Sequence, residues 1–256
     1  MHVGRSQSTA LRLLRKMDLI PKKPSATTHV LSEADKKRRA AICRDLPKKN
    51  RRGSFFHRII TLDEKWCLYD APDQSMQWVK RDEKPSPVQR KNIHGKKSML
   101  TVFWCIDGPI LWKLVPQGKP VGADYVCQEF QEMDSNAEKC GKKRDQISLL
   151  WDNCRPHFAK EAQEKLEEFY LEIFPQLAYN SDLAPSDSHL LRSLTHWLKG
   201  IQLRSEDDLK LELSAFFESK KRSFFDYGIR SLAHRWQTVF HFQQICELLP
   251  INMLLF

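Results

Sequence analysis

The stretch from Leu149 to Gly200 constrains the fold of this chain more than any other part of the sequence. It holds a short apolar run, an amphipathic stretch, a second apolar run, a loop and a final helical stretch. Asp152 follows the first run, and Asp187 stands where the loop enters the last helix, with 34 residues between the two acids. A third acid, Asp63, lies inside the strand-like run RIITLDEKWCLYD. We therefore predict that these three carboxylates, distant in sequence, meet in one site.

Strand-length runs rich in β-branched and aromatic residues occupy much of residues 55–116, and the run over 55–70 is predicted to be one strand. Helices are predicted at 32–46, 123–139, 205–222 and 224–245, and in the stretch that Gly200 ends. A short buried strand is expected before Asp152. This order predicts an α/β fold with a mixed sheet flanked by helices, and Trp66 and Trp78 are expected to pack under the sheet.

The formal charge of +10 is concentrated near the N-terminus. Residues 1–60 carry 16 Lys and Arg against 4 Asp and Glu, whereas the other 196 residues carry 26 against 28. Such asymmetry is typical of a chain that binds nucleic acid, although a solvated basic tail is the alternative. We expect no membrane span and no signal peptide, and the seven scattered cysteines, which form no CxxC pair, favour a reducing compartment.

The basic N-terminal region is predicted to contain a short helix over 5–17 with an apolar face and a basic face. This is the pattern of the second helix of a helix-turn-helix, whose N-terminal end enters the major groove of DNA. An extended linker follows, and a second helix begins at Ser32, which forms a capping-box pattern with Asp35. The residues expected to bind DNA are Ser8, Arg12, Arg15, Lys16, Lys22 and Lys23.

Three carboxylates around one hollow repel each other unless cations neutralise them. Mg²⁺ and Mn²⁺ take oxygen ligands and are the natural counterions, and two such ions can support phosphoryl transfer. Each acid also has a structural interpretation. Asp63 fits an edge ion pair, Asp152 a turn at a strand end, and Asp187 a favourable charge at a helix start. Spacing alone leaves both interpretations open.

Three blocks of sequence resemble the signature blocks of mariner-type transposases, in the Tc1/mariner superfamily. They are TLDEKW at 61–66, WDNCRPH at 151–157 and YNSDLAPSDSHLLRSL at 179–194. The spacing between Asp152 and Asp187 also matches the family, and the similarity runs from about residue 6 to about residue 236. The transposase half of proteins that fuse a SET domain to a mariner transposase is similar as well.

The resemblance implies an RNase H-like catalytic domain that performs cut-and-paste DNA transposition, with cleavage at terminal inverted repeats and joining at TA sites. It also implies that Asp63, Asp152 and Asp187 are catalytic and hold Mg²⁺ or Mn²⁺, with two ions expected, and that the protein acts as a homodimer. The expected domains are a helix-turn-helix remnant at 1–23, a basic linker at 24–53, a catalytic domain at 54–236 with a clamp loop at 80–97, and a divergent tail at 237–256.

The sequence departs from the family pattern at several places. No first helix-turn-helix is present, THVLS stands where the family has WVPHEL, and the sequence after Gln237 differs from the usual ending. We therefore hypothesise an N-terminally truncated copy that retains its metal site but has little or no transposition activity. The alternatives are a catalytically inactive relic that still binds DNA and an RNase H-type nuclease unrelated to transposition. Nuclear localisation is expected because DNA is the substrate.

Overall fold

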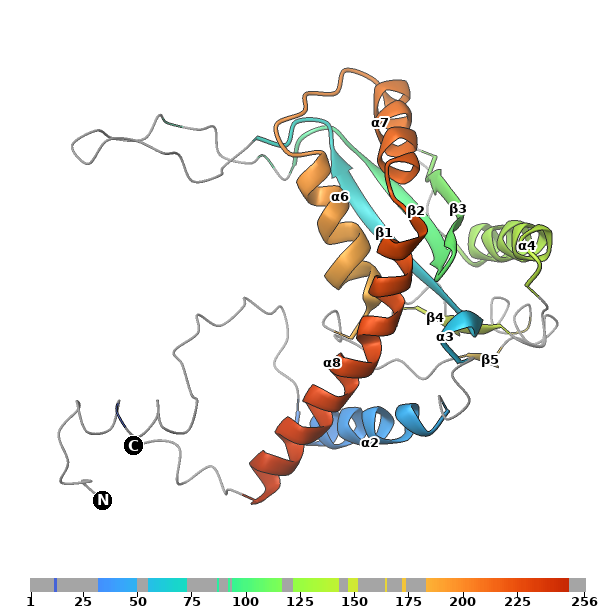
Figure 1. Cartoon of the computed structure of the whole chain (residues 1–256). Helices are drawn as coiled ribbons and strands as arrows, with labels where there is room; N and C mark the ends of the chain where they lie inside the picture. The colour runs from blue at the N-terminus through green and yellow to red at the C-terminus, as the bar shows by residue number, and fades with distance from the viewer. Residues whose placement is uncertain are drawn as a thin grey trace.

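The computed structural model describes residues 12, 32–49, 55–72, 87, 92, 94–116, 122–142, 147–151, 164, 172–173 and 183–248. Within these residues a five-stranded sheet has the order β3-β2-β1-β4-β5 (Figure 1). The strands are β1 (Ile59–Leu68), β2 (Lys97–Cys105), β3 (Gly108–Leu114), β4 (Ser148–Leu150) and β5 (Glu172–Ile173). Because β1, β2 and β3 pair antiparallel while β4 and β5 continue the sheet in parallel, the prediction of a mixed sheet is confirmed.

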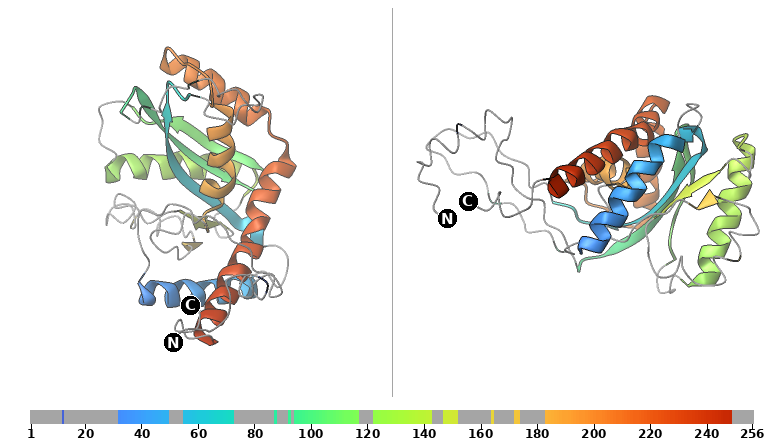
Figure 2. Two further views of the ribbon diagram at one scale, coloured as in Figure 1. Left: turned by 90° about the vertical axis from the view of Figure 1, so that its left-hand side faces the viewer. Right: turned by 90° about the horizontal axis from the view of Figure 1, so that it is seen from below.

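Helices cover both faces of the sheet (Figures 1 and 2). On one face lies α4 (Ala123–Lys139), and its core includes Ile60 and Leu62 of β1. The opposite face is covered by α6 (Leu191–Trp197), α7 (Glu206–Glu218) and α8 (Arg222–Leu248), over a core that includes Ile59 and Cys67. The alternation of side chains along β1 therefore supplies two separate cores.

The long helix α8 also packs against α2 (Glu33–Lys49), which crosses it at the lower end of the molecule in Figure 1. The predicted cap of α2 is present, because Ser32 Oγ accepts the amide of Asp35 at 3.1 Å and the Asp35 carboxylate accepts the amide of Ser32 at 3.2 Å. The stacked rings of Phe56 and Trp236 join α8 to the start of the sheet. This packing makes the basic helix part of the folded domain.

The observed elements agree with most of the predicted ones. The helix predicted at 123–139 is α4, and those predicted at 205–222 and 224–245 correspond to α7 and α8. Gly200 ends its helical stretch with a φ of 79°, the left-handed conformation that favours glycine. The prediction that 55–70 is one strand was wrong at its start, because Phe55–Arg58 form the helical turn α3. Their two phenylalanines pack beside α8 instead of alternating across the sheet.

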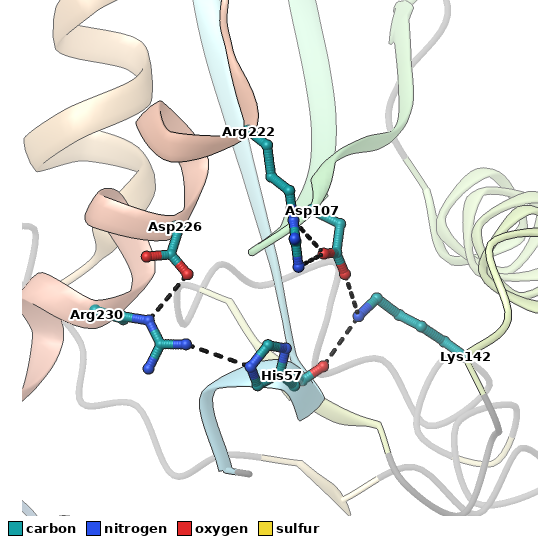
Figure 3. Close-up of polar contacts among 6 residues, drawn as sticks. All are labelled: His57, Asp107, Lys142, Arg222, Asp226 and Arg230. Carbon is teal, nitrogen blue, oxygen red and sulfur yellow. Dashed lines mark hydrogen bonds and ion pairs between the residues drawn. The ribbon is translucent and has the colours of Figure 1, made fainter. Parts of the chain in front are cut away.

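A polar cluster joins several of these elements (Figure 3). His57 lies in α3, Asp107 in the turn between β2 and β3, and Lys142 just after α4. The other members, in α8, are Arg222, Asp226 and Arg230. The Lys142 ammonium donates to the backbone oxygen of His57 at 2.9 Å and lies 3.4 Å from the Asp107 carboxylate. This cluster connects helices on both faces of the sheet to the residues that lead into β1.

None of the described helices combines the length and apolar character needed to cross a membrane.

Candidate active site

Asp63 lies in the middle of the sheet. It occupies β1, pairs with Val102 of β2, and is 8% exposed. One of its carboxylate oxygens accepts the backbone amide of Glu64 at 2.9 Å. Because alternate residues of a strand share a face, Asp63 lies on the same face as Thr61, whose hydroxyl contacts the segment that carries Asp187.

Asp187 lies in a π-helical turn, η3 (Ser186–Leu190), that leads directly into α6. Its side chain is exposed, while Ser186 and Leu190 on either side are buried. The prediction that a helix begins at this acid is confirmed, but the wider π-helical geometry was not predicted. Such turns are rare and are often found at functional sites. The structure thus presents this carboxylate to solvent from a firmly packed turn.

The hydroxyl of Ser186 joins η3 to the sheet. It lies 3.2 Å from Thr61 Oγ1 on β1 and accepts the indole N–H of Trp104 on β2 at 3.0 Å. All three residues are buried. The structure therefore brings the strand of Asp63 and the turn of Asp187 together through a direct hydrogen bond one or two residues from each acid.

His189 attaches the same turn to α8. Its Nε2 lies 2.9 Å from the backbone oxygen of Phe224, which can only accept, so Nε2 carries the hydrogen. Burial lowers the pKa of this imidazole, and the charges of Arg235 and Lys220 lower it further, against the opposing effect of the Phe224 carbonyl. His189 therefore donates to the backbone of α8 and attaches η3 to that helix.

Asp152, the remaining acid, lies outside the described residues. The strand before it pairs parallel with β1, from Ile59 with Ser148 to Thr61 with Leu150. The prediction that its strand neighbours that of Asp63 is thus confirmed for the part that is described. Among the described residues, no three His, Cys, Asp or Glu side chains form a group that could hold a metal ion.

The predicted DNA-binding residues fall largely outside the described part of the chain. Arg12 is helical and exposed, while the other five lie outside it: Ser8, Arg15, Lys16, Lys22 and Lys23. Further along the chain, Lys37, Arg38 and Arg44 are exposed on α2.

A further buried acid, Glu129, was not predicted from the sequence. It lies on α4 and is 1% exposed, on the sheet face opposite Asp63. Burial raises the pKa of its carboxyl to about 7, and Glu64 adds to this, while the charge of Lys113 and the hydroxyl groups of Tyr125 and Thr101 oppose it. Its position among the apolar residues of an amphipathic helix was the available signal.

Two other side chains of β1, those of Trp66 and Cys67, lie in opposite environments, one exposed and one buried. Trp66 was expected under the sheet, but this was wrong, because it is 52% exposed and lies beneath the ammonium of Lys97 at 4.8 Å. Trp78 lies outside the described residues. Burial raises the pKa of the Cys67 thiol to about 11, with Lys65 opposing the effect, so Cys67 is a neutral core residue and no nucleophile.

The mixed sheet, with an acid on its central strand and another at the start of a helix packed on that strand, defines an α/β domain of the RNase H-like class. Among solved structures, the catalytic domain of Mos1 mariner transposase superposes with a TM-score of 0.70 at 29% identity, covering 85% of this chain and 97% of that one. The family model described as "Transposase (partial DDE domain)" matches residues 68–148. The chain is 32% identical over 236 residues to the mariner Mos1 transposase of Drosophila mauritiana, covering 91% of this chain and 68% of that protein. The chain therefore belongs to the mariner family of transposases.

Other relatives add detail. The chain is 32% identical over 235 residues to the histone-lysine N-methyltransferase SETMAR of Homo sapiens, but it spans only 34% of that protein's length. Structures of the Mos1 paired-end complex, one with the left transposon end, one with Mn and one with Mg, each match with a TM-score of 0.80. Their identities are 33%, 32% and 32%, and each match covers 92% of this chain and 70% of the other.

Proposed function

We propose that this chain cleaves and joins DNA by metal-dependent phosphoryl transfer, with Asp63, Asp152 and Asp187 as the metal ligands. The observation that carries the proposal is the hydrogen bond between Thr61 and Ser186, which attaches the turn of Asp187 to the strand of Asp63. Asp152 stands two residues beyond Leu150, which pairs with Thr61.

The residues present fit a hard divalent cation. Asp63 is a carboxylate with only 8% exposure, and a buried charge of this kind is costly unless a cation or donor groups compensate it. Carboxylate oxygens are the ligands preferred by Mg²⁺ and Mn²⁺. The Mos1 structures with Mn and with Mg support the same choice of metal. When bound, two such ions would activate the attacking oxygen and stabilise the leaving oxygen.

The side chains of the protein have separate tasks in this proposal. Asp63, on a central strand with partners on both sides, provides a rigid ligand. Asp187, exposed on a packed turn, provides a ligand on the side open to a DNA strand. The imidazole of His189 holds that turn in place through its hydrogen bond to the backbone of Phe224.

The substrate is proposed to be double-stranded DNA, because the matched Mos1 structures are complexes with transposon ends. Terminal inverted repeats, TA target sites and a homodimer are part of the proposal, as are contacts from the N-terminal basic residues and from the clamp loop at 80–97. Nuclear localisation follows from the same substrate. The domain limits of 1–23, 24–53, 54–236 and 237–256 also remain proposals, and α8 runs without a break through Gln237.

The proposal is tested by nicking of supercoiled plasmid by the full chain in Mg²⁺ or Mn²⁺, compared with Asp152→Ala. We expect metal-dependent nicking that the variant lacks. Nicking that is equal in the variant would refute the assignment of Asp152. DNA binding without nicking would instead identify the chain as an inactive DNA-binding relic, and cleavage confined to RNA–DNA hybrids would identify an RNase H-type nuclease.

A further inference from the structure

We propose that Ser186 is a positioning residue for metal binding, because its hydroxyl holds the turn that carries Asp187 against the strand that carries Asp63. This inference rests on the proposed function. It adds a role for three residues, Ser186, Thr61 and Trp104, which we call the Ser186 bridge.

The hydrogen-bonding capacity of a serine hydroxyl fits both contacts of the bridge. Trp104 Nε1 can only donate, so Ser186 Oγ accepts from it at 3.0 Å. Ser186 Oγ also lies 3.2 Å from Thr61 Oγ1, and either hydroxyl can donate to the other. Alanine offers neither group, so no apolar residue of similar size could make this connection.

The register of the sheet brings the two partners of Ser186 together. Thr61 and Trp104 are directly opposite each other in the antiparallel β1–β2 pair. Asp63 follows Thr61 by two residues on the same face, and Asp187 follows Ser186 by one residue. The bridge therefore joins the two acid-bearing elements at buried positions two residues from Asp63 and one residue from Asp187.

Burial makes these hydrogen bonds decisive for position. Ser186 and Trp104 are 0% exposed and Thr61 is 1% exposed, so water cannot replace a partner that is lost. Metal ligands depend on such supporting bonds, and their removal typically weakens metal binding by about 10-fold to 100-fold. A small shift of η3 away from β1 would thus weaken the site while the rest of the domain stays folded.

The turn has other attachments that maintain the fold without the bridge. His189 bonds the backbone of Phe224, and Leu190 and Leu191 are buried in the core. Removal of the Ser186 hydroxyl should therefore leave the chain folded, because these contacts remain. This separation of folding from metal affinity distinguishes a positioning role from a purely structural one.

The test is calorimetric titration of the full chain with Mn²⁺ alone, together with thermal melting in the absence of metal. Ser186→Ala and Thr61→Val, which is nearly isosteric, should each weaken Mn²⁺ binding by about 10-fold. Thr61→Ser retains the hydroxyl and should bind Mn²⁺ within about twofold of the wild type, as a rescue. Thr101→Val is the matched control, because Thr101 is equally buried on β2 but faces away from η3.

Three outcomes decide the matter. Weaker Mn²⁺ binding in Ser186→Ala and Thr61→Val but not in Thr101→Val, with thermal melts that show folded protein, supports the positioning role. Wild-type affinity in both variants, while Asp63→Asn abolishes binding, overturns the positioning role and leaves the proposed function intact. If the wild-type chain fails to bind Mn²⁺, or Asp63→Asn binds it equally well, the proposed function fails and the positioning role fails with it. Should Ser186→Ala not fold, Thr61→Val decides.

Discussion

Arg222, the first residue of α8, places its Nη2 atom 2.7 Å from the carboxylate of Asp107 in the turn between β2 and β3 (Figure 3). Its Nε atom donates to the same carboxylate oxygen at 2.9 Å. Lys142 approaches the other oxygen of Asp107 from the end of α4. One exposed turn thus connects the helices on the two faces of the sheet.

Asp107→Asn should lower the free energy of unfolding by about 1 kcal/mol at neutral pH, because it removes two ion pairs that are partly exposed to solvent. Burial alone would raise the pKa of Asp107, but its bonds to Arg222 and Lys142 outweigh this and lower it below the usual 3.8. A lowered pKa stabilises the fold above pH 3.8, and the effect disappears as the pH falls through the folded value.

Thermal melts of the wild-type chain and Asp107→Asn from pH 3 to pH 7 measure this effect. The difference in melting temperature should be constant above about pH 5 and should close at lower pH. Asp226→Asn, which removes a single pair within α8, is the control and should cost about half as much. A difference that grows toward acid pH would contradict the assignment.

Glu129→Gln should stabilise the chain at alkaline pH. The folded state holds the proton of Glu129 up to a pKa of about 7, whereas the ordinary value is 4.5. Wild-type stability should therefore fall as the pH rises from 4.5 to about 7, and stay level above it. The amide cannot ionise. The free energy of unfolding of the variant should therefore exceed that of the wild type by on the order of 2–3 kcal/mol at pH 8 and by little at pH 4.5.

Denaturant unfolding at several pH values checks the Glu129 prediction. Glu138→Gln, an exposed change on the same helix, should leave the pH dependence of the wild type unaltered. Equal pH dependence in the wild type and Glu129→Gln would show that folding does not raise the pKa of this carboxyl.

Gly228→Ala should destabilise the chain, although alanine in a helix interior normally stabilises by about 1 kcal/mol relative to glycine. A Cβ atom at this position of α8 would lie 2.5 Å from His189 Cδ2 and 2.9 Å from the Trp104 ring. Both side chains belong to the support of η3, so we expect a loss of about 1–3 kcal/mol and weaker metal binding.

Equilibrium unfolding and Mn²⁺ titration measure both consequences of Gly228→Ala. Gly122→Ala, where the new methyl group meets no atom within 4 Å, is the steric control and should change stability by less than about 0.5 kcal/mol. A stabilised Gly228→Ala variant would show that α8 lies further from η3 than the structure has it.

The sequence was sufficient to predict the mixed sheet, Asp63 in a strand and Asp187 at a helix start. These features depend on local patterns, because strand runs, capping residues and the Gly200 terminator act over a few positions. The helix α2 is an example, since Ser32 and Asp35 specify its start by themselves.

Other features depend on contacts between distant residues and could not be read from the sequence. The π-helical turn at Ser186 is held by Trp104, which lies 82 positions away. Trp66 is exposed because its end of β1 extends past the core under α4, and a hydrophobic residue type carries no information about that length. Glu129 lies on the apolar face of α4, but a carboxyl side chain is normally exposed, so its residue type predicts the opposite of its burial.

Asp63 is proposed to hold a metal ion used to cleave DNA, and replacement of this ligand by cysteine tests that bond. Thiolate is a poor ligand for Mg²⁺ and a better one for Mn²⁺, so the metal preference of Asp63→Cys reports on the bond itself. Asp63→Ser is the control for size, because it offers no charged ligand, and should nick plasmid in neither metal.

The decisive measurement is the rate of plasmid nicking by Asp63→Cys in Mg²⁺ and in Mn²⁺. We expect the rate to fall about 100-fold or more in Mg²⁺ and to recover at least about 10-fold when Mn²⁺ replaces it. Nicking at the wild-type rate in Mg²⁺, or an equal loss in both metals, would contradict the claim that this carboxylate holds the metal.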